Sequence, residues 1–240
     1  MIVALQTARA GSKSVINKNI MLMGKKPMYR HALDKAIGSS KIDHVYVSTD
    51  IQEIINSDSA QYQAFERPQH LAQDDSSHQD VMIHGIDWIE KSLGAQVEII
   101  VVLLGNSLGS SSKVLDDAIK MLQDNPDADS IVSVSEFNMF NPFRALKISG
   151  GLIETWLEQD KISEMKTIRN VNDKKSAGNI YFANGSFFIC RRSAVLSKEG
   201  NLPFPWLGKK ILPWVEEAAM EIDAPWQAEV LKSMLGTKNV

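Results

Sequence analysis

The first 50 residues constrain the fold most, because they hold two apolar strands on either side of a helix. Met1–Leu5 is an apolar run too short for a helix, so it predicts a strand buried in a sheet. Apolar residues at helical spacing over 28–37, with Pro27 before them and Gly38 after them, predict a helix. Val45–Thr49 predicts the next strand. Strand, helix and strand in this order form a βαβ unit, whose strands run parallel with a right-handed crossover.

The loop that follows the first strand is rich in small and cationic residues. Gly11 allows the backbone to turn and to approach a ligand closely. Arg9, Lys13 and Lys18 add positive charge, and an arginine fork can grip phosphate oxygens. In open parallel sheets ligands bind at the carboxyl ends of strands, where this loop lies. The pattern predicts a triphosphate cradle, although it matches neither common phosphate fingerprint and ordinary surface lysines would read the same way.

The rest of the chain continues the alternation of strands and helices. Val97–Leu104 is a continuous apolar run, which predicts a strand buried on both faces of a parallel sheet. Ser76 or Ser77 can cap the helix that follows them. The further predicted elements are a helix capped by Ser112, strands at Ser130–Ser135 and Asn179–Arg192, and a last helix with Pro225 in its first turn. The fold class is α/β, with a mostly parallel, open twisted sheet and helices on both faces.

Composition excludes several classes of protein. The 240 residues are 44% hydrophobic and 23% charged, which is typical of a globular domain and not of disorder. The net charge of −3 offers no surface for nucleic acid or an anionic membrane. No apolar run approaches the ~20 residues of a membrane span, and the start lacks a basic signal-peptide region. The one cysteine, Cys190, reads as a buried thiol in a reducing compartment, so we expect a cytoplasmic protein.

The loop string resembles a known family. A-R-x-G-S-K, then K-N, then Leu22–Pro27 as an L-x-G-K-P-like segment, is similar to the N-terminus of the sugar-acid cytidylyltransferases, the acylneuraminate cytidylyltransferase (CMP-sialic acid synthetase) family. Two positions depart from the family pattern: Thr7 stands where proline is common, and Ser14 where glycine is common. The resemblance implies a nucleotidyltransferase fold, a CTP substrate and Mg²⁺.

The resemblance also implies which residues hold the nucleotide. Arg67 and Ser77 lie in a second family-like string, R-P-x-x-L-A-x-D followed by Ser-Ser, although a surface arginine and a helix cap would explain them equally well. Lys18 and Arg9 are the expected catalytic cations. The full expected nucleotide set is Arg9, Gly11, Ser12, Lys13, Lys18, Asn19, Arg67, Ser77 and Asn106.

The stretch 105–112 departs most from the family. Sialate enzymes usually carry Q-P-T-S-P-L-R here, and octulosonate enzymes carry Q-G-D-E-P, whose Asp helps to hold metal. This chain has a polar, flexible-looking loop with neither the Gln nor the Asp. Asn106 can accept a hydrogen bond from a base or a water, but it replaces a carboxylate ligand poorly. Base preference and metal count therefore stay open at this point.

Family resemblance further implies an acceptor site and a metal site. Expected acceptor contacts are Arg144 in N-P-F-R, Asn184 in N-G, Phe204 in an aromatic connection, and Arg169 and Lys174, lent by a partner subunit. Each has a plainer explanation in surface charge or loop packing. Glu221 and Asp223 stand where the family has D-I-D, whose alternate carboxylates share one face and hold Mg²⁺. An N-cap role for Asp223 and a surface role for Glu221 are the alternatives.

Residues 141–183 resemble the family's protruding arm, which pairs two subunits. Gly150-Gly151 between two strand-like pieces is a hairpin signal. We therefore expect one nucleotidyltransferase domain over 1–240, a β-rich dimerisation arm and a homodimer. The expected reaction is transfer of CMP from CTP to an acidic sugar of the nonulosonic, sialic-acid-like type, with release of pyrophosphate. A phosphonate or another small acid as acceptor, or a nucleotide-binding relative without turnover, remain alternatives.

Overall fold

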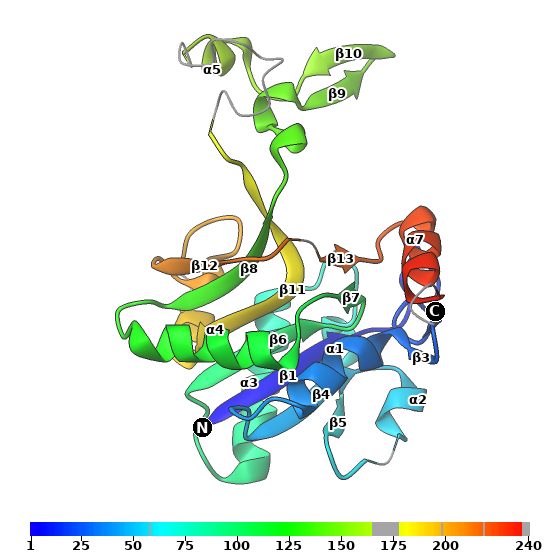
Figure 1. Ribbon diagram of the computed structural model, residues 1–240, viewed down its shortest axis with the longest axis vertical. Coiled ribbons are helices and arrows are strands. Elements are labelled where there is room, and N and C mark those ends of the chain that lie inside the picture. Colours follow the sequence, from blue (N-terminus) through cyan, green and yellow to red (C-terminus); the bar gives the residue numbers. More distant parts are fainter. Residues whose placement is uncertain (58, 165–177, 198, 218, 237–240) are drawn as a thin grey trace.

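A seven-stranded sheet forms the centre of the structure, a computed structural model that describes residues 1–57, 59–164, 178–197, 199–217 and 219–236 (Figure 1). The strand order is β12-β8-β11-β6-β1-β4-β5. Of these described strands only β11 runs antiparallel to its neighbours, so the sheet is mostly parallel, as predicted. The strands are β1 (Ile2–Ala8), β4 (His44–Thr49), β5 (Gln63–Glu66), β6 (Ile99–Leu104), β8 (Ser130–Glu136), β11 (Tyr181–Arg191) and β12 (Ile211–Val215).

Helices cover both faces of the sheet, because successive side chains of a strand point to opposite sides. In β1, Ile2 and Ala4 pack beneath α1 (Met28–Ile37) and α4 (Ser112–Asp124). Val3 and Leu5 pack on the other face, beneath α3 (His78–Leu93). The predicted α/β class with helices on both faces is confirmed.

Two helix starts test the predicted caps. Ser77 caps α3, where its Oγ accepts a hydrogen bond from the backbone N–H of Asp80 at 3.4 Å. The predicted cap of α4 was Ser112, and this is wrong by one residue. Ser111 takes the extended cap conformation and accepts from the N–H of Val114 at 3.3 Å, so Ser112 is already the first helical residue.

The remaining elements outside the arm are shorter and do not belong to the seven-stranded sheet. They are β2 (Leu22–Met23), β3 (Lys26–Pro27), α2 (Gln52–Ile55), η1 (Gln69–Leu71), β7 (Ser107–Leu108), α6 (Arg192–Leu196), η4 (Pro205–Leu207), β13 (Met220–Glu221) and α7 (Pro225–Gly236). The stretch 105–112 is not merely a polar loop, since β7 pairs with β13 and the N–H of Ile222 donates to the carbonyl of Asn106 at 2.9 Å. This pairing fixes the C-terminal segment beside the end of β6.

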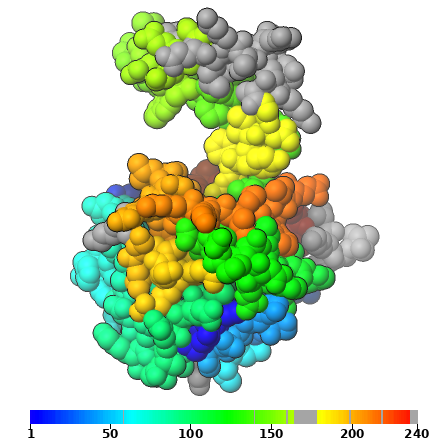
Figure 2. All heavy atoms as spheres, turned by 90° about the vertical axis from the view of Figure 1, so that its left-hand side faces the viewer, coloured from blue at the N-terminus to red at the C-terminus, as the bar shows by residue number. Residues whose placement is uncertain are grey.

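Between β8 and β11 the chain leaves the sheet and forms a projection (Figure 1), which we call the arm. Its described elements are η2 (Asn138–Phe140), η3 (Pro142–Arg144), β9 (Leu146–Ser149), β10 (Leu152–Thr155) and α5 (Gln159–Glu164). The predicted hairpin is present, with Gly150 and Gly151 at positive φ between β9 and β10. The hairpin carries exposed apolar side chains, among them Ile148 at 82% exposure. Figure 2 shows the start of β11 and the arm standing clear of the sheet and its helices.

Among the described residues, no helix combines the length and the apolar character that a membrane crossing requires. Cys190 is fully buried in the core beneath α3, and burial raises the pKa of its thiol. The prediction of a buried core cysteine is confirmed.

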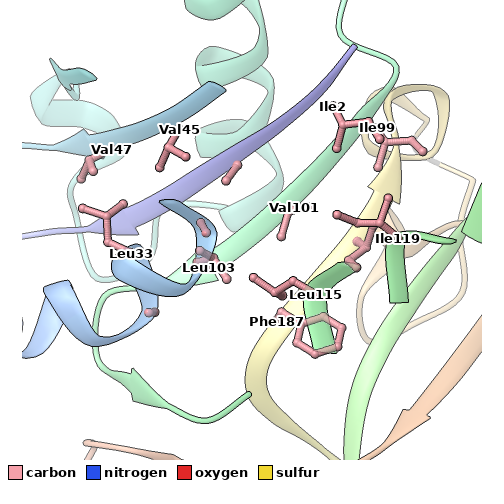
Figure 3. Close-up of a cluster of buried hydrophobic side chains, with 14 of the residues drawn as sticks. Ile2, Leu33, Val45, Val47, Ile99, Val101, Leu103, Leu115, Ile119 and Phe187 are labelled. Atoms are coloured by element: carbon pink, nitrogen blue, oxygen red, sulfur yellow. The ribbon is translucent and has the colours of Figure 1, made fainter. Parts of the chain in front are cut away.

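We expect Phe187→Ala to lower the free energy of unfolding by about 3–5 kcal/mol, because it leaves a cavity in a closed core. Phe187 is fully buried among the side chains beneath α4 (Figure 3). Urea unfolding followed by circular dichroism measures the change. Phe182→Ala is the matched control, since Phe182 lies on the same strand with 40% exposure. Equal losses in the two variants would contradict the core assignment.

Candidate active site

The loop after β1 is closed by its own hydrogen bonds. Asn19 donates from Nδ2 to the carbonyl of Arg9 at 2.8 Å, which joins the two ends of the loop. The N–H of Ala10 donates to Asp50 Oδ1 at 2.7 Å, so the loop is also tied to the end of β4. Gly11 has φ +70°, in the region that favours glycine, and no neighbouring atom crowds it. The predicted cradle is therefore an ordered loop at the carboxyl edge of the sheet.

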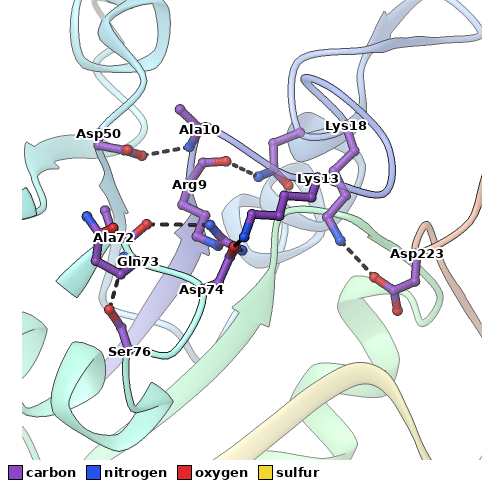
Figure 4. A network of polar contacts seen from close by, with 11 residues as sticks. Arg9, Ala10, Lys13, Lys18, Asp50, Ala72, Gln73, Asp74, Ser76 and Asp223 are labelled. Carbon is purple, nitrogen blue, oxygen red and sulfur yellow. Dashed lines mark hydrogen bonds and ion pairs between the residues drawn. The ribbon is translucent and has the colours of Figure 1, made fainter. Parts of the chain in front are cut away.

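Two of the predicted phosphate-binding cations meet one carboxylate (Figure 4). Asp74 lies 2.5 Å from Arg9 Nη2 and 2.6 Å from Lys13 Nζ, and Arg9 Nη1 also donates to the carbonyl of Ala72 at 3.4 Å. Hydrogen bonds from Lys13 and Arg9 hold the pKa of Asp74 below its usual value. The two cations thus converge on one point, which the Asp74 carboxylate occupies.

The third cation faces the C-terminal carboxylates. Lys18 Nζ lies 2.7 Å from Asp223 Oδ1, with the lysine largely buried and the aspartate exposed. Asn106 donates from Nδ2 to the same Asp223 oxygen at 3.4 Å and to the carbonyl of Ile222 at 3.2 Å. Four residues predicted separately for nucleotide and metal, Lys18, Asn106, Glu221 and Asp223, therefore lie together around the β7–β13 pair.

Glu221 is the more buried of the two carboxylates. Burial raises its pKa, the nearby charge of Asp223 raises it further, and Lys18 and a hydrogen bond from Asn106 oppose this. A Cβ at Gly185 would overlap the Glu221 carboxylate, so glycine is required beside it. Within the described residues no three His, Cys, Asp or Glu side chains form a metal-binding group. Two hard carboxylates are nevertheless a set that Mg²⁺ uses, because it completes its shell with waters and phosphates.

A cavity of about 220 Å³ lies between the cations and α3. Its lining includes Arg9, Lys18 and Asn106 on one side and Arg67 and His78 on the other. A second hollow, of about 380 Å³, shares Arg9, Gln73 and Asp74 with it and extends to Gly11 and Lys13. A larger one of about 620 Å³ lies between α1, α2, β4 and β5 and contains none of the predicted site residues. The predicted site residues therefore gather at the first two hollows.

Arg67 and His78 line the inner wall of the cavity, where Arg67 is charged and His78 is neutral. Arg67 is 5% exposed and is held by Ser48, to whose hydroxyl its Nε donates at 3.2 Å and to whose carbonyl its Nη2 donates at 2.7 Å. Burial lowers its pKa to about 10, so the guanidinium stays charged at neutral pH. Burial and the charge of Arg67 lower the pKa of His78 to about 4, so the imidazole is neutral there and lies 3.3 Å from the hydroxyl of Thr7.

Comparison with known proteins identifies the family of this chain. The family model described as "Cytidylyltransferase" matches residues 3–196. The chain belongs to the cytidylyltransferase family. The predicted family is thereby confirmed.

Individual relatives of this cytidylyltransferase are distant. A Helicobacter pylori protein named pseudaminic acid cytidylyltransferase and UDP-2,4-diacetamido-2,4,6-trideoxy-beta-L-altropyranose hydrolase is 26% identical over 78% of this chain, which spans only 35% of that protein. A Legionella pneumophila CMP-N,N'-diacetyllegionaminic acid synthase is 28% identical over 93% of this chain and 91% of its own length. A solved CMP:2-keto-3-deoxy-manno-octonic acid synthetase complexed with CTP covers 99% of both chains with a TM-score of 0.71 and 14% identity, which shows the fold alone.

The remaining predicted residues of the cytidylyltransferase do not join the contacts described above. Ser12 is buried in the loop, and the exposed Ser77 is engaged as the cap of α3. Asn184 belongs to a different polar cluster near the base of the arm. Arg144 is exposed in η3 of the arm, and Phe204 packs near Phe188 and Trp206. Arg169 and Lys174 lie outside the described residues.

Sequence reasoning missed the acidic and neutral partners in the site. Asp74 was part of a recognised string, but nothing in the sequence places it against Arg9, which lies 65 positions earlier. Asp50 follows a predicted strand, and a carboxylate at a strand's carboxyl end was an available signal. His78 and Thr7 meet only because α3 packs across β1.

The half-buried imidazole of His78 predicts a pH-dependent stability. Its pKa is lowered in the folded state, so the stability that it contributes is present above its unfolded pKa of about 6.5 and is lost as the pH falls toward 4. Between pH 7.5 and pH 5 we expect the wild-type protein to lose about 2 kcal/mol more unfolding free energy than His78→Gln. Urea titrations at both pH values measure it. The control is His44→Gln, which removes an exposed imidazole; a parallel fall in wild type and His78→Gln would contradict the assignment.

Proposed function

We propose that this chain transfers CMP from CTP to an acidic sugar of the nonulosonic type and releases pyrophosphate. The observation that carries the proposal is the convergence of Arg9 and Lys13 on Asp74 and of Lys18 on Asp223, at the carboxyl edge of the sheet. The names of the Helicobacter and Legionella relatives support a nonulosonic acceptor. We further propose that residues 1–240 act as one nucleotidyltransferase domain in the cytoplasm, with no nucleic-acid or membrane partner.

The cations act on the triphosphate by position and charge. Phosphoryl transfer of this kind needs little covalent help, and stabilisation of charge on the phosphates supplies most of the catalysis. CTP would replace Asp74 as the partner of Arg9 and Lys13, and its phosphates would also meet Lys18. Gly11, Ser12 and Asn19 shape the loop around them. Arg67, Ser77 and Asn106 would seat the nucleoside, and the neutral His78 keeps a second cation out of that wall.

Asp223 and Glu221 would hold Mg²⁺. The metal supplies charge neutralisation at the triphosphate when it is bound. Asp223 is exposed and faces Lys18, so the lysine must give up this carboxylate to a metal and take a phosphate instead. Glu221 is anchored by the β7–β13 pair, is more buried, and lies near enough to Asp223 and Lys18 for both charges to shift its pKa.

For the acceptor we propose the expected residues Arg144, Asn184 and Phe204, together with Arg169 and Lys174 from a partner subunit. Arg144 would pair with the sugar carboxylate, for which a planar guanidinium is well shaped. A phosphonate acceptor keeps the enzyme class and changes this half of the site. A nucleotide-binding relative without turnover would keep only the cation loop.

Pyrophosphate release with each of the four NTPs, Mg²⁺ and a panel of acidic sugars and phosphonates tests the proposal. We expect release with CTP and a nonulosonic acid, and its loss in EDTA. Lys18→Ala and Asp223→Asn should each lower the rate by about 10²–10³-fold, because each removes a charge that faces the reacting phosphates. Lys91→Ala, at an exposed lysine on α3, is the matched control.

The other outcomes of this assay are equally informative. Release with phosphonates alone would replace the acceptor. CTP binding by calorimetry without release from any acid would favour the silent binder. No binding of CTP would contradict the proposal as a whole.

We also propose that the arm joins two copies into a homodimer. Its hairpin exposes Ile148 and Ile153, which face each other across β9 and β10 and would otherwise remain in water. The double change Ile148→Glu with Ile153→Glu should convert a dimer to a monomer in sedimentation equilibrium. Lys147→Gln, on the opposite face of the hairpin, should leave the dimer intact. A monomeric wild-type protein would contradict the proposal.

A further inference from the structure

A second polar cluster lies where β8 and β11 leave the sheet for the arm. Glu216 follows β12 and is fixed by its backbone N–H, which donates to the carbonyl of Val134 at 2.9 Å. Its carboxylate accepts from Ser110 Oγ at 2.7 Å through Oε1 and from Asn184 Nδ2 at 3.4 Å through Oε2. Ser110 and Asn184, from two separate segments, therefore both bond to the Glu216 carboxylate.

Ser110 is held in an unusual conformation to make this contact. Its φ of +47° lies in the left-handed region, which few residues other than glycine adopt. The Ser110 hydroxyl lies 2.5 Å from the hydroxyl of Ser186 as well as bonding to Glu216. The preceding residue is closely packed, since a Cβ at Gly109 would lie 2.5 Å from the Ser186 hydroxyl. Backbone strain that is kept by its surroundings is a feature of functional sites.

Three of the four hydrogen-bonding capacities of the Asn184 amide are engaged inside the cluster. Nδ2 donates to Ser135 Oγ at 2.9 Å and to Glu216, while Oδ1 accepts from the N–H of Ser186 at 3.1 Å. The residue is 6% exposed. Glu216 is half-buried, and a carboxylate with two accepted hydrogen bonds has room for about two more. Asn184 is thus placed to orient Glu216, and Glu216 is the group with capacity for a ligand.

The cluster adjoins the carboxylates of the proposed reaction centre. Gly185, next to Asn184, lies directly against the Glu221 carboxylate, and Glu221 neighbours Asp223, the partner of Lys18. The nucleotide cavity lies on the Lys18 and Asn106 side of these carboxylates. Because the attacking and leaving oxygens are roughly in line in phosphoryl transfer, the acceptor must enter from the side away from the pyrophosphate. Asn184 and Glu216 lie on the Gly185 side.

We propose that Glu216 is a specificity-determining residue for the acceptor, held in place by Ser110 and Asn184. The inference rests on the proposed function and narrows its substrate class. A carboxylate accepts hydrogen bonds from the hydroxyl or amide N–H groups of a polyhydroxylated acid. It repels the dianion of a small phosphonate. Glu216 therefore selects sugar acids over the alternative acceptors, and Asn184 serves the acceptor by positioning Glu216 and not by direct contact.

Glu216→Gln tests this assignment with N-acetylneuraminic acid and N,N'-diacetyllegionaminic acid as sugar probes and 2-hydroxyethylphosphonate, which carries no ammonium group, as the competing class. We expect the KM of the sugar acid to rise about tenfold or more and the KM of CTP to change less than twofold, because a hydrogen bond to a charged group is lost only on the acceptor side. Binding of the phosphonate should become tighter. Ser110→Ala should raise the same acceptor KM by a smaller factor. Glu217→Gln, at the exposed neighbouring glutamate, should change neither constant.

Two failures can be told apart. A sugar-acid KM that is unchanged in Glu216→Gln, or a KM of CTP that rises by the same factor, would overturn the role of Glu216 while the proposed function stands. A wild-type protein that binds CTP but neither binds nor converts a sugar acid, by calorimetry and pyrophosphate release, would overturn the acceptor part of the proposed function and this inference with it. Thermal unfolding of each variant confirms that it is folded.

Discussion

The ion pair between Lys18 and Asp223 joins the two ends of the site. These residues are 205 positions apart, and the backbone of the aspartate is held by the β7–β13 pair and by the fully buried Ile222 beside it. Three cations in one short loop repel one another unless carboxylates lie among them. Asp223 and Asp74 supply that balance, and under the proposed function the phosphates of CTP would take their place beside the three cations.

The fold was predictable where side-chain periodicity is strong. The strand at Met1–Leu5 and the helix over 28–37 could be recognised from local sequence. A strand buried on both faces is continuously apolar, and an amphipathic helix repeats every 3.6 residues. Boundaries were less predictable. Ser111 and Ser112 can each cap a helix, and only the backbone conformation of the preceding turn, with Ser110 at positive φ, selects the first.

The site was predictable only as residue types. The cation loop could be recognised from its own order, yet its partners come from loops distant in sequence. Asp74 meets Arg9 and Lys13 because the loop before α3 folds back over the end of β1, and no local pattern encodes that approach. The side-chain amide of Asn184 could not be placed from sequence either. Its three hydrogen-bond partners belong to β8, β11 and the segment after β12.

Asn106 shows how one amide changes the electrostatics of this site. Glu221 already has a raised pKa, through burial and through the charge of Asp223. A third carboxylate at position 106 would add a like charge beside both and would favour protonation of one of them. The Asn106 amide instead donates to Asp223 and lowers the pKa of Glu221. With Lys18 as the counter-charge, Glu221 is thereby kept closer to the ionised state that a hard cation requires.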